Sequence, residues 1–152
     1  MATLKIVTGE NQPILRTKTR RVPAVTNNVQ TILRDMEKAT VKADGLGLAA
    51  PQVGLDMRMC IARVNGRLTP MVNPEITWRS KTTETAEEGC LSLPGVWVPV
   101  PRSTSIVVRY QTARGDTKEL RLTDMDARVV QHETDHLDGV LIVDYASAGA
   151  VL

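Results

Sequence analysis

The chain has 152 residues, 19 of them Lys or Arg and 17 Asp or Glu, and 42% of its residues are hydrophobic. This length is typical of one domain and the composition is typical of a folded chain, so we expect a single domain over residues 1–152. The net charge of +2 gives no sign of a nucleic-acid binder's basic face, and no apolar run approaches the roughly 20 residues of a membrane span. Because the start resembles neither a signal peptide nor a transit peptide, we expect a cytoplasmic protein with reduced cysteines.

The first segment, to about Pro23, is expected to form loop with short extended pieces. A helix is predicted to follow it, because apolar residues recur there at helical spacing and form one face. These residues are Val25, Val29, Ile32, Leu33, Met36 and Ala43. Thr26 or Asn27 could cap the start of this helix, and Gly45 lies just past its end.

Short runs that are β-branched or alternating replace this pattern between Asp56 and about Leu122. Such runs predict strands, and Asn-Gly at 65–66 and Gly-Asp at 115–116 predict hairpin turns between them. The predicted strands are Met57–Val64, Thr69–Trp78, Lys81–Glu87, Val96–Val100, Ser105–Thr112 and Thr117–Leu122.

A second helix is predicted from about Asp124 to Asp138. Thr123 is a suitable N-cap for it, and Gly139 is a suitable residue to end it. After this helix, residues 140–152 form a short tail with one strand-like apolar run.

Both histidines of the chain lie in the second predicted helix, in the sequence His-Glu-Thr-Asp-His at 132–136. Residues four apart share one face of a helix, so His132 and His136 can reach the same metal ion. Glu133, next to the first histidine, can act on a water bound to that metal. The alternative is that these are two structural or surface histidines in a polar helix.

A catalytic metal site needs a third protein ligand if a fourth position is to stay open for water. The 16 residues after His136 contain no Glu and no His, and Asp138 lies too close to His136 on the same helix to complete the site. We therefore expect the third ligand upstream. Cys90 is the best candidate, in a stretch bounded by Gly and Pro, where metal binding would hold its sulfur as thiolate. Most free cysteines are small buried hydrophobes, an interpretation that suits Cys60 better.

A glycine-rich segment at 45–54 reads Gly-Leu-Gly-Leu-Ala-Ala-Pro-Gln-Val-Gly. Alternate glycines permit a close approach by another backbone. The segment lacks the third glycine of a dinucleotide-binding fingerprint and the Gly-Lys-Ser/Thr of a phosphate loop. Taken alone it predicts a helix-to-strand loop, in which Gln52 is the one side chain able to donate a hydrogen bond.

Together, these three stretches resemble the peptide deformylase family, whose members remove the N-formyl group from newly made polypeptides. The family carries Gly-x-Gly-x-Ala-Ala-x-Gln, Glu-Gly-Cys-Leu-Ser and Gln-His-Glu-x-Asp-His-Leu-x-Gly in this order. This chain has GLGLAAPQ at 45–52, EGCLS at 88–92 and QHETDHLDG at 131–139, so the resemblance covers nearly the whole chain. It implies an α+β fold in which antiparallel strands surround a central HExxH helix, together with an N-terminal helix.

The resemblance also implies the function, a metal-dependent hydrolase that releases formate from N-terminal formylmethionine, and a role for each matched residue. Glu133 would be the general base and acid, while the side-chain amide of Gln52 and the backbone N–H of Leu91 would hold the formyl oxygen. The implied metal ligands are Cys90, His132 and His136. The residues implied for the substrate backbone and the methionine pocket are Gly45, Leu46, Gly47, Glu88, Gly89, Arg128 and Val129.

Cofactor and partners follow from the same resemblance. Two imidazoles and a thiolate suit zinc, iron(II), nickel and cobalt. The family implies one iron(II) in the cell, with nickel, cobalt or zinc in a preparation, and N-formylmethionyl peptides as substrates. The ribosome is a further candidate partner, but many bacterial members dock on it through a long basic C-terminal helix that this sequence does not show. The segment at 95–98, with Trp97 after the cysteine motif, resembles the organellar-type branch of the family. For an organellar or viral source, the expected location would be an organelle's interior or an infected cell.

Two other classes of function remain alternatives. One is a metal-dependent peptidase that uses HExxH, against which stands the missing downstream ligand. The other is a non-catalytic metal-binding or ribosome-associated module. A purely structural site would not need Glu133 or Gln52 and would fill all four metal positions with protein ligands.

Overall fold

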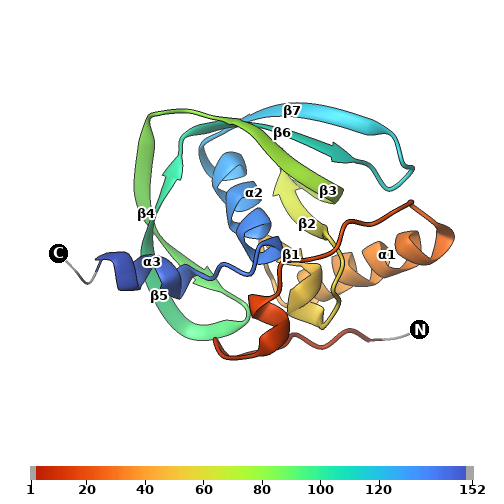
Figure 1. Ribbon diagram of the computed structural model, residues 1–152, viewed down its shortest axis with the longest axis horizontal. Helices are drawn as coiled ribbons and strands as arrows, with labels where there is room; N and C mark the ends of the chain where they lie inside the picture. The colour runs from red at the N-terminus through yellow and green to blue at the C-terminus, as the bar shows by residue number, and fades with distance from the viewer. Residues whose placement is uncertain (1–2, 150–152) are drawn as a thin grey trace.

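The computed structural model describes residues 3–149, which form three α-helices and seven strands (Figure 1). The helices are α1 (Asn27–Lys42), α2 (Asp124–Leu137) and α3 (Ile142–Gly149). The strands are β1 (Gly47–Ala49), β2 (Met59–Val64), β3 (Arg67–Arg79), β4 (Thr83–Cys90), β5 (Leu93–Ser103), β6 (Ser105–Gln111) and β7 (Thr117–Thr123). Two short 3-10 helices are η1 (Pro13–Arg16) and η2 (Ala50–Val53).

The strands form two antiparallel sheets within residues 3–149. The larger sheet has five strands in the order β1-β2-β3-β6-β7, and β4 pairs with β5 in a two-stranded sheet. The hairpin between β2 and β3 turns at Asn65 and Gly66, whose φ angles of 51° and 77° are those of an Asn-Gly turn. Gly115, with φ of 89°, lies in the turn between β6 and β7. Both predicted hairpin turns are confirmed.

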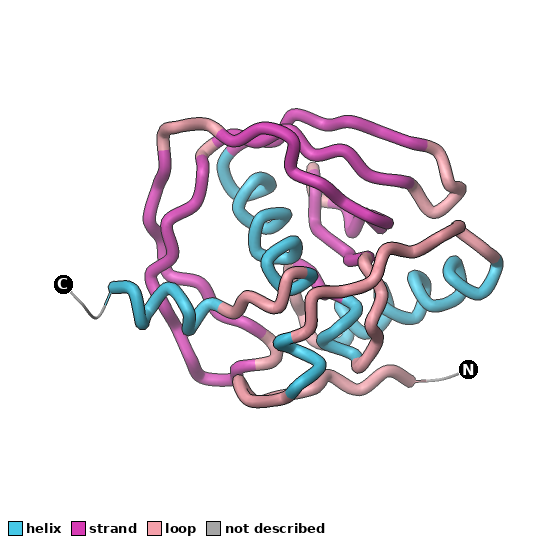
Figure 2. Tube along the Cα trace, in the orientation of Figure 1, coloured by secondary structure: helices cyan, strands magenta, loops and turns pink. Residues whose placement is uncertain are grey.

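Helix α2 lies in the interior, with strands of both sheets around it (Figures 1 and 2). Eight of its fourteen residues are buried. Val130 and Leu137, for example, pack with residues of β2, β3, β6 and β7 in one core cluster. Thr123 occupies the N-cap position without a side-chain capping bond, and Gly139 follows the helix with φ of 74°. The predicted α+β fold, with antiparallel strands around a central helix, is therefore confirmed.

Helix α1 begins where the sequence predicts. Thr26 is its N-cap, and the Thr26 hydroxyl accepts a hydrogen bond of 3.2 Å from the backbone N–H of Val29. The buried face of the helix, which includes Leu33 and Met36, packs with β1 and β2 in a second core cluster. Helix α1 therefore packs against the strand that leads into η2.

Residues 47–49 differ from the sequence prediction. The sequence predicts a loop here, whereas the structure forms β1, in which Gly47 pairs with Ala62 and Ala49 pairs with Cys60 of β2. A strand of three residues is too short to show an alternating pattern, so periodicity could not reveal it.

The tail also differs, because its apolar run forms helix α3 and not a strand. Leu141, Ile142 and Tyr145 fall at helical spacing, and they pack with residues of β5 in a third core cluster. Asp144 accepts a hydrogen bond of 3.0 Å from the backbone N–H of Leu141, which fixes the start of the helix. Residues 150–152 of the predicted tail lie outside the described residues.

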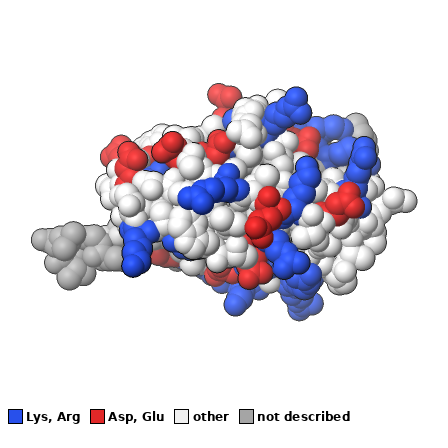
Figure 3. Space-filling view, turned by 90° about the horizontal axis from the view of Figure 1, so that it is seen from above, with Lys and Arg blue, Asp and Glu red and all other residues white. Residues whose placement is uncertain are grey.

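Charges of both signs are interspersed over the surface. Figure 3 shows basic and acidic side chains mixed on the face seen from above in Figure 1. In the densest basic stretch of the sequence, Arg16 pairs with Asp144 at 2.8 Å and Arg20 pairs with Asp56 at 3.3 Å. Within residues 3–149, no helix combines the length and the apolar character needed to cross a membrane.

Candidate active site and metal centre

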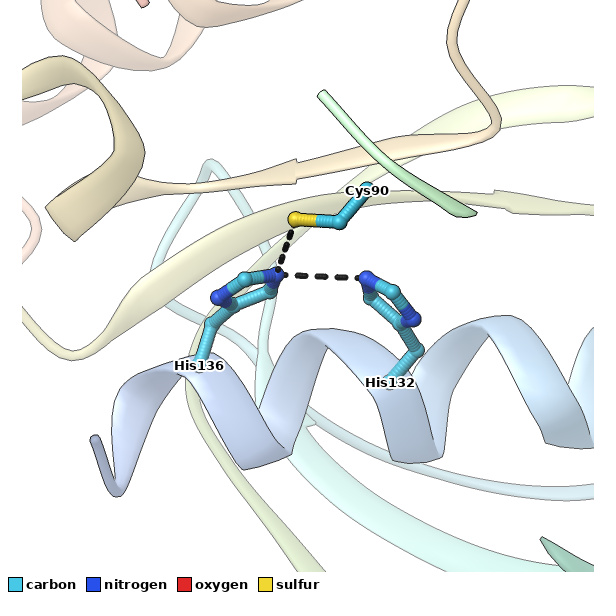
Figure 4. A group of neighbouring side chains, drawn as sticks. All are labelled: Cys90, His132 and His136. Carbon is cyan, nitrogen blue, oxygen red and sulfur yellow. Dashed lines mark hydrogen bonds between the residues drawn. The ribbon is translucent and has the colours of Figure 1, made fainter. Parts of the chain in front are cut away.

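Three side chains with metal-binding donor atoms converge beside α2 (Figure 4). His132 and His136 lie one turn apart on the same face of α2, and Cys90 is the last residue of β4. The Nε2 atoms of the two imidazoles are 3.2 Å apart, and the Sγ atom of Cys90 lies 3.4 Å from His136 Nε2. All three donor atoms lie within 4.8 Å of one another. Helical spacing thus places the imidazoles, and β4 brings the sulfur across to them.

This donor set suits one metal ion with an open coordination position. Two imidazoles and one thiolate are three of the four ligands of a tetrahedral site, which leaves a place for water or substrate. Asp138, the nearest downstream carboxylate, forms an ion pair with Arg58 at 2.8 Å and does not join the donors. Among residues 3–149, no other cluster of His, Cys, Asp or Glu side chains has this geometry.

His132 is oriented by a buried carboxylate. Its Nδ1–H donates a hydrogen bond of 2.9 Å to Glu88, which leaves Nε2 to face the other donors. Burial would raise the pKa of Glu88, but hydrogen bonds from Arg102 and His132 lower it to about 2. Burial likewise opposes charge on His132, yet its hydrogen bonds with Cys90 and Glu88 raise the pKa of His132 to about 10. A metal ion would take the place of the proton on Nε2 and leave the bond to Glu88 intact.

His136 has different surroundings. Its side chain is buried, and its Nδ1 atom has no hydrogen-bond partner among the residues that the structure describes. Burial and the neighbouring His132 lower the pKa of His136. A neutral imidazole is the form that binds a metal ion through nitrogen, so this burial favours the metal-binding state.

Two arginines hold Glu88 in place. Arg102 donates to both carboxylate oxygens, at 2.8 and 2.9 Å, and Arg128 donates to Oε2 at 2.6 Å. Arg102 also pairs with Asp135 at 2.5 Å. The side chains of Arg102 and Glu88 are 4% and 5% exposed, so each charge is balanced by partners and hardly at all by water. The structure therefore places Glu88 as the acceptor that fixes His132, in addition to lining the cavity described below.

Glu133 directs its carboxylate toward β1. A Cβ atom at Gly47 would lie 2.5 Å from Glu133 Oε2, so this close approach requires glycine. The Oε1 atom of Glu133 is buried and has no hydrogen-bond partner among the described residues. Burial raises the pKa of Glu133 to about 7. A carboxyl group with such a pKa can accept and release a proton near neutral pH.

Gln52 lies in η2, directly after β1, and its amide is held at both ends. The backbone N–H of Ala49 donates to Gln52 Oε1 at 2.9 Å, so the Nε2 end of the amide faces the donor cluster. Nε2 donates to the hydroxyl of Ser92 at 3.2 Å and lies 3.7 Å from the sulfur of Cys90. The amide N–H₂ therefore has a fixed direction close to the metal donors.

A cavity of about 360 Å³ opens onto these groups. Its lining includes every residue that the sequence predicts for the site except the buried His136. These residues are Gly45, Leu46, Gly47, Gln52, Glu88, Gly89, Cys90, Leu91, Arg128, Val129, His132 and Glu133. Three large apolar side chains of the lining are exposed: Leu46 is 52% exposed, Trp97 67% and Met125 57%. Gly89 makes room for Trp97, because a Cβ atom there would lie 2.9 Å from its ring.

Sequence reasoning assigned no role to four residues around the donors, namely Ser92, Arg102, Asp135 and Tyr145. Ser92 and Asp135 lie inside the two motifs, so their position was a signal that could have been used. Arg102 and Tyr145 lie outside every motif. Their contacts depend on the pairing of β4 with β5 and on the packing of α3, which no local pattern shows.

Comparisons with known proteins identify the family of this chain. The family model for polypeptide deformylase matches residues 3–150. The peptide deformylase of Dictyoglomus thermophilum is 46% identical over 134 residues, which are 88% of this chain and 87% of that protein. The crystal structure of peptide deformylase from Thermotoga maritima has a TM-score of 0.91 and 40% identity, covering 95% of this chain and 97% of that one. The class I type b enzyme from Acinetobacter baumannii, bound to Met-Ala-Ser, has a TM-score of 0.88 and 32% identity, covering 94% and 98%. This chain therefore belongs to the peptide deformylase family.

Proposed function

We propose that this chain has the activity of its family and removes the formyl group from the N-terminal formylmethionine of nascent polypeptides, with release of formate. One observation carries the proposal: two metal donors, a buried carboxylate and a fixed amide line one cavity, as Cys90, His132, Glu133 and Gln52. Hydrolysis of a formyl amide needs an activated water, a proton carrier and a donor to the carbonyl oxygen, and this cavity holds a group for each. The place of action would be the cytoplasm, or the interior of an organelle or an infected cell.

Cys90, His132 and His136 would together hold one divalent metal ion. When bound, such an ion makes a water molecule reactive at neutral pH and polarises a carbonyl oxygen. We propose iron(II) in the cell, with nickel, cobalt or zinc able to occupy the same donors in a preparation. The proton transfers and the alignment of the substrate are left to the side chains of the chain itself.

Glu133 would carry the protons. Its carboxylate accepts a proton as a water oxygen forms a bond with the formyl carbon. It then gives that proton to the substrate nitrogen as the carbon–nitrogen bond breaks, so the products are formate and a free amino terminus. The pKa of about 7, which burial of the carboxyl group causes, suits both steps near neutral pH.

Gln52 and Leu91 would stabilise the formyl oxygen as it becomes negatively charged. The amide of Gln52 is already held by Ala49 and Ser92, so it need not reorganise when charge develops. Leu91 lines the same cavity and follows Cys90 directly, which supports a role for its backbone N–H. One such donor is typically worth about 3 kcal/mol of transition-state stabilisation.

The peptide substrate would pair with the edge of β1. Strand β1 is the last strand at one end of the larger sheet, and Gly45, Leu46 and Gly47 line the cavity. An extended peptide can add to such an edge through main-chain hydrogen bonds. The complex of the Acinetobacter baumannii relative with Met-Ala-Ser supports a peptide that begins with methionine as occupant.

The methionine side chain would lie against α2. Val129 and the stem of Arg128 line the cavity there, with Glu88 and Gly89 of β4 beside them. The guanidinium group of Arg128 donates to Glu88 and to the backbone carbonyl oxygens of Val100 and Glu84, so its charge is directed away from an apolar occupant. The pocket is therefore expected to prefer an unbranched apolar side chain.

Formate release tests the proposal. The protein would be purified without oxygen, loaded with iron(II) or nickel, and mixed with N-formyl-Met-Ala-Ser. We expect formate at an enzymatic rate, intact internal peptide bonds and much slower turnover of N-formyl-Asp-Ala-Ser. Cleavage of internal bonds would favour a metallopeptidase, and absence of formate from folded, metal-loaded protein would overturn the proposal.

A further inference from the structure

A chain of hydrogen bonds links helix α3 to the metal-donor side chains. The hydroxyl of Tyr145, in α3, donates to Asp135 at 2.6 Å and accepts from Arg102 at 3.2 Å. Arg102 in turn holds both oxygens of Glu88, and Glu88 accepts the Nδ1–H of His132. Three consecutive contacts therefore connect a side chain of α3 with an imidazole that faces the metal position.

Tyr145 contacts Asp135, which is the member of this hydrogen-bond network that water can reach. The side chain of Asp135 is 21% exposed, whereas those of Arg102 and Glu88 are 4% and 5% exposed. The ring of Tyr145 lies over the Arg102 guanidinium, at 5.0 Å from the ring centroid, and its hydroxyl bridges Arg102 and Asp135. Burial and the bond to Asp135 raise the pKa of Tyr145 to about 12, so the hydroxyl keeps its proton and donates.

The hydroxyl determines how firmly Arg102 is held. Arg102 approaches Glu88 through Nε and Nη2, and it approaches Asp135 and Tyr145 through Nη1. Without the hydroxyl, Asp135 loses its second partner and can turn toward water. Arg102 would then lose the group that fixes its Nη1 end, and the planar guanidinium would transmit that freedom to Glu88.

We propose that Tyr145 is a positioning residue for the metal centre, which acts through Arg102 and Glu88 to hold His132 in its metal-binding orientation. The inference rests on the metal site of the proposed function and extends it to helix α3. Tyr145 does not line the cavity, so its contribution is to metal retention and not to substrate binding.

The test compares the substitutions Tyr145→Phe and Asp144→Asn. Tyr145→Phe removes only the bridging hydroxyl. Asp144→Asn weakens the ion pair of α3 with Arg16 and its bond to the backbone of Leu141, and it leaves the hydrogen-bond chain untouched. Each protein would be loaded with nickel or cobalt, and the transfer of metal to a chelator would be followed. Outer-shell partners of a metal ligand are typically worth about 10–100-fold in metal affinity, so for this more remote residue we expect roughly 3–10-fold faster metal loss in Tyr145→Phe and an unchanged rate in Asp144→Asn.

A double-substitution cycle tests the route. In an Asp135→Ala background, Tyr145→Phe is expected to add little further metal loss, because the acceptor of the Tyr145 hydroxyl is already gone. Equal metal loss in Tyr145→Phe and Asp144→Asn would assign the effect to docking of α3, and wild-type retention in Tyr145→Phe would overturn the proposal. An undiminished effect of Tyr145→Phe in the Asp135→Ala background would overturn the route.

Substrate kinetics separate this inference from the proposed function. Fully loaded Tyr145→Phe protein is expected to keep the wild-type KM for a formylated peptide, and a raised KM would contradict the inference. The chelator assay needs no substrate. If the wild-type protein releases no formate and the Tyr145→Phe protein loses metal faster than the wild type, the proposed function is refuted and the role of Tyr145 is still supported.

Discussion

The surroundings of the two imidazoles of α2 differ. His132 is held by a buried network of charges, in which Glu88 accepts its Nδ1–H and Arg102 and Arg128 hold Glu88. His136 is held by packing in the interior, and its Nδ1 atom has no hydrogen-bond partner among the described residues. The metal position thus lies between a polar scaffold that fixes direction and an apolar core that excludes water.

The charged side and the apolar side of the metal position have different roles. The charged side fixes the tautomer and the ring orientation of His132 through largely buried hydrogen bonds and ion pairs. The apolar side keeps the second ligand neutral, because burial lowers the pKa of His136. Cys90 lies beside both imidazoles, so a substitution there should disturb both sides, whereas substitutions in one side should have smaller effects.

The largest effect is expected from removal of the donor that faces both imidazoles. Cys90→Ala leaves two protein ligands, and we expect loss of bound metal together with loss of formate release. Cys60→Ala is the matched control, because Cys60 is fully buried in a core cluster and is not one of the three clustered donors. Metal content per chain and turnover would be measured for both, and a Cys90→Ala protein that keeps its metal would exclude the thiolate as a ligand.

Glu133→Ala is expected to keep the metal and to lose turnover. General acid–base groups contribute about 10²–10⁴-fold, so formate release should fall within that range. Glu133→Gln keeps the size of the side chain and should show the same loss. Full activity in either protein would reject Glu133 as the proton carrier.

Gln52→Leu removes an amide donor beside Cys90 and should lower kcat by about 10²–10³-fold. Because the Gln52 amide contacts Ala49, Ser92 and Cys90 and neither imidazole, bound metal should stay at the wild-type level. A change in metal content without a change in kcat would show that the amide serves the thiolate and not the formyl oxygen.

Glu88→Gln isolates the charged side. An amide is a weaker acceptor for His132 and leaves the buried Arg102 and the partly buried Arg128 with less compensation, so we expect metal affinity to fall by about 10–100-fold. Glu87→Gln, at the exposed neighbouring position, is the matched control and should leave metal affinity unchanged. Equal affinity in the two proteins would show that packing alone orients His132.

Much of this architecture could be predicted from the sequence because its signals are local. The helical spacing of residues 25–43, the Asn-Gly turn and the i, i+4 histidines each lie within one element, and the structure has them where the pattern places them. The lack of a suitable ligand after His136 also predicts an upstream ligand, and the sulfur of Cys90 lies 3.4 Å from His136 Nε2.

The rest could not be predicted because it depends on contacts between distant segments. Strand β1 is three residues long and shows itself only through its pairing with β2. Helix α3 is eight residues long, and its apolar residues were too few to separate a helical from an extended pattern. The roles of Arg102 and Tyr145 depend on the packing of β5 and α3 against β4. Charged residues are mostly exposed in proteins, so nothing in the local sequence predicts that Arg102 is buried.

Hydrolysis should depend on one metal ion held by Cys90, His132 and His136. The most direct test is to titrate metal-free protein with nickel and to measure formate release at each addition. We expect no formate from metal-free protein, a linear rise on addition of nickel, and a break at one ion per chain. Formate release at the full rate without metal, or a break at two ions per chain, would contradict it.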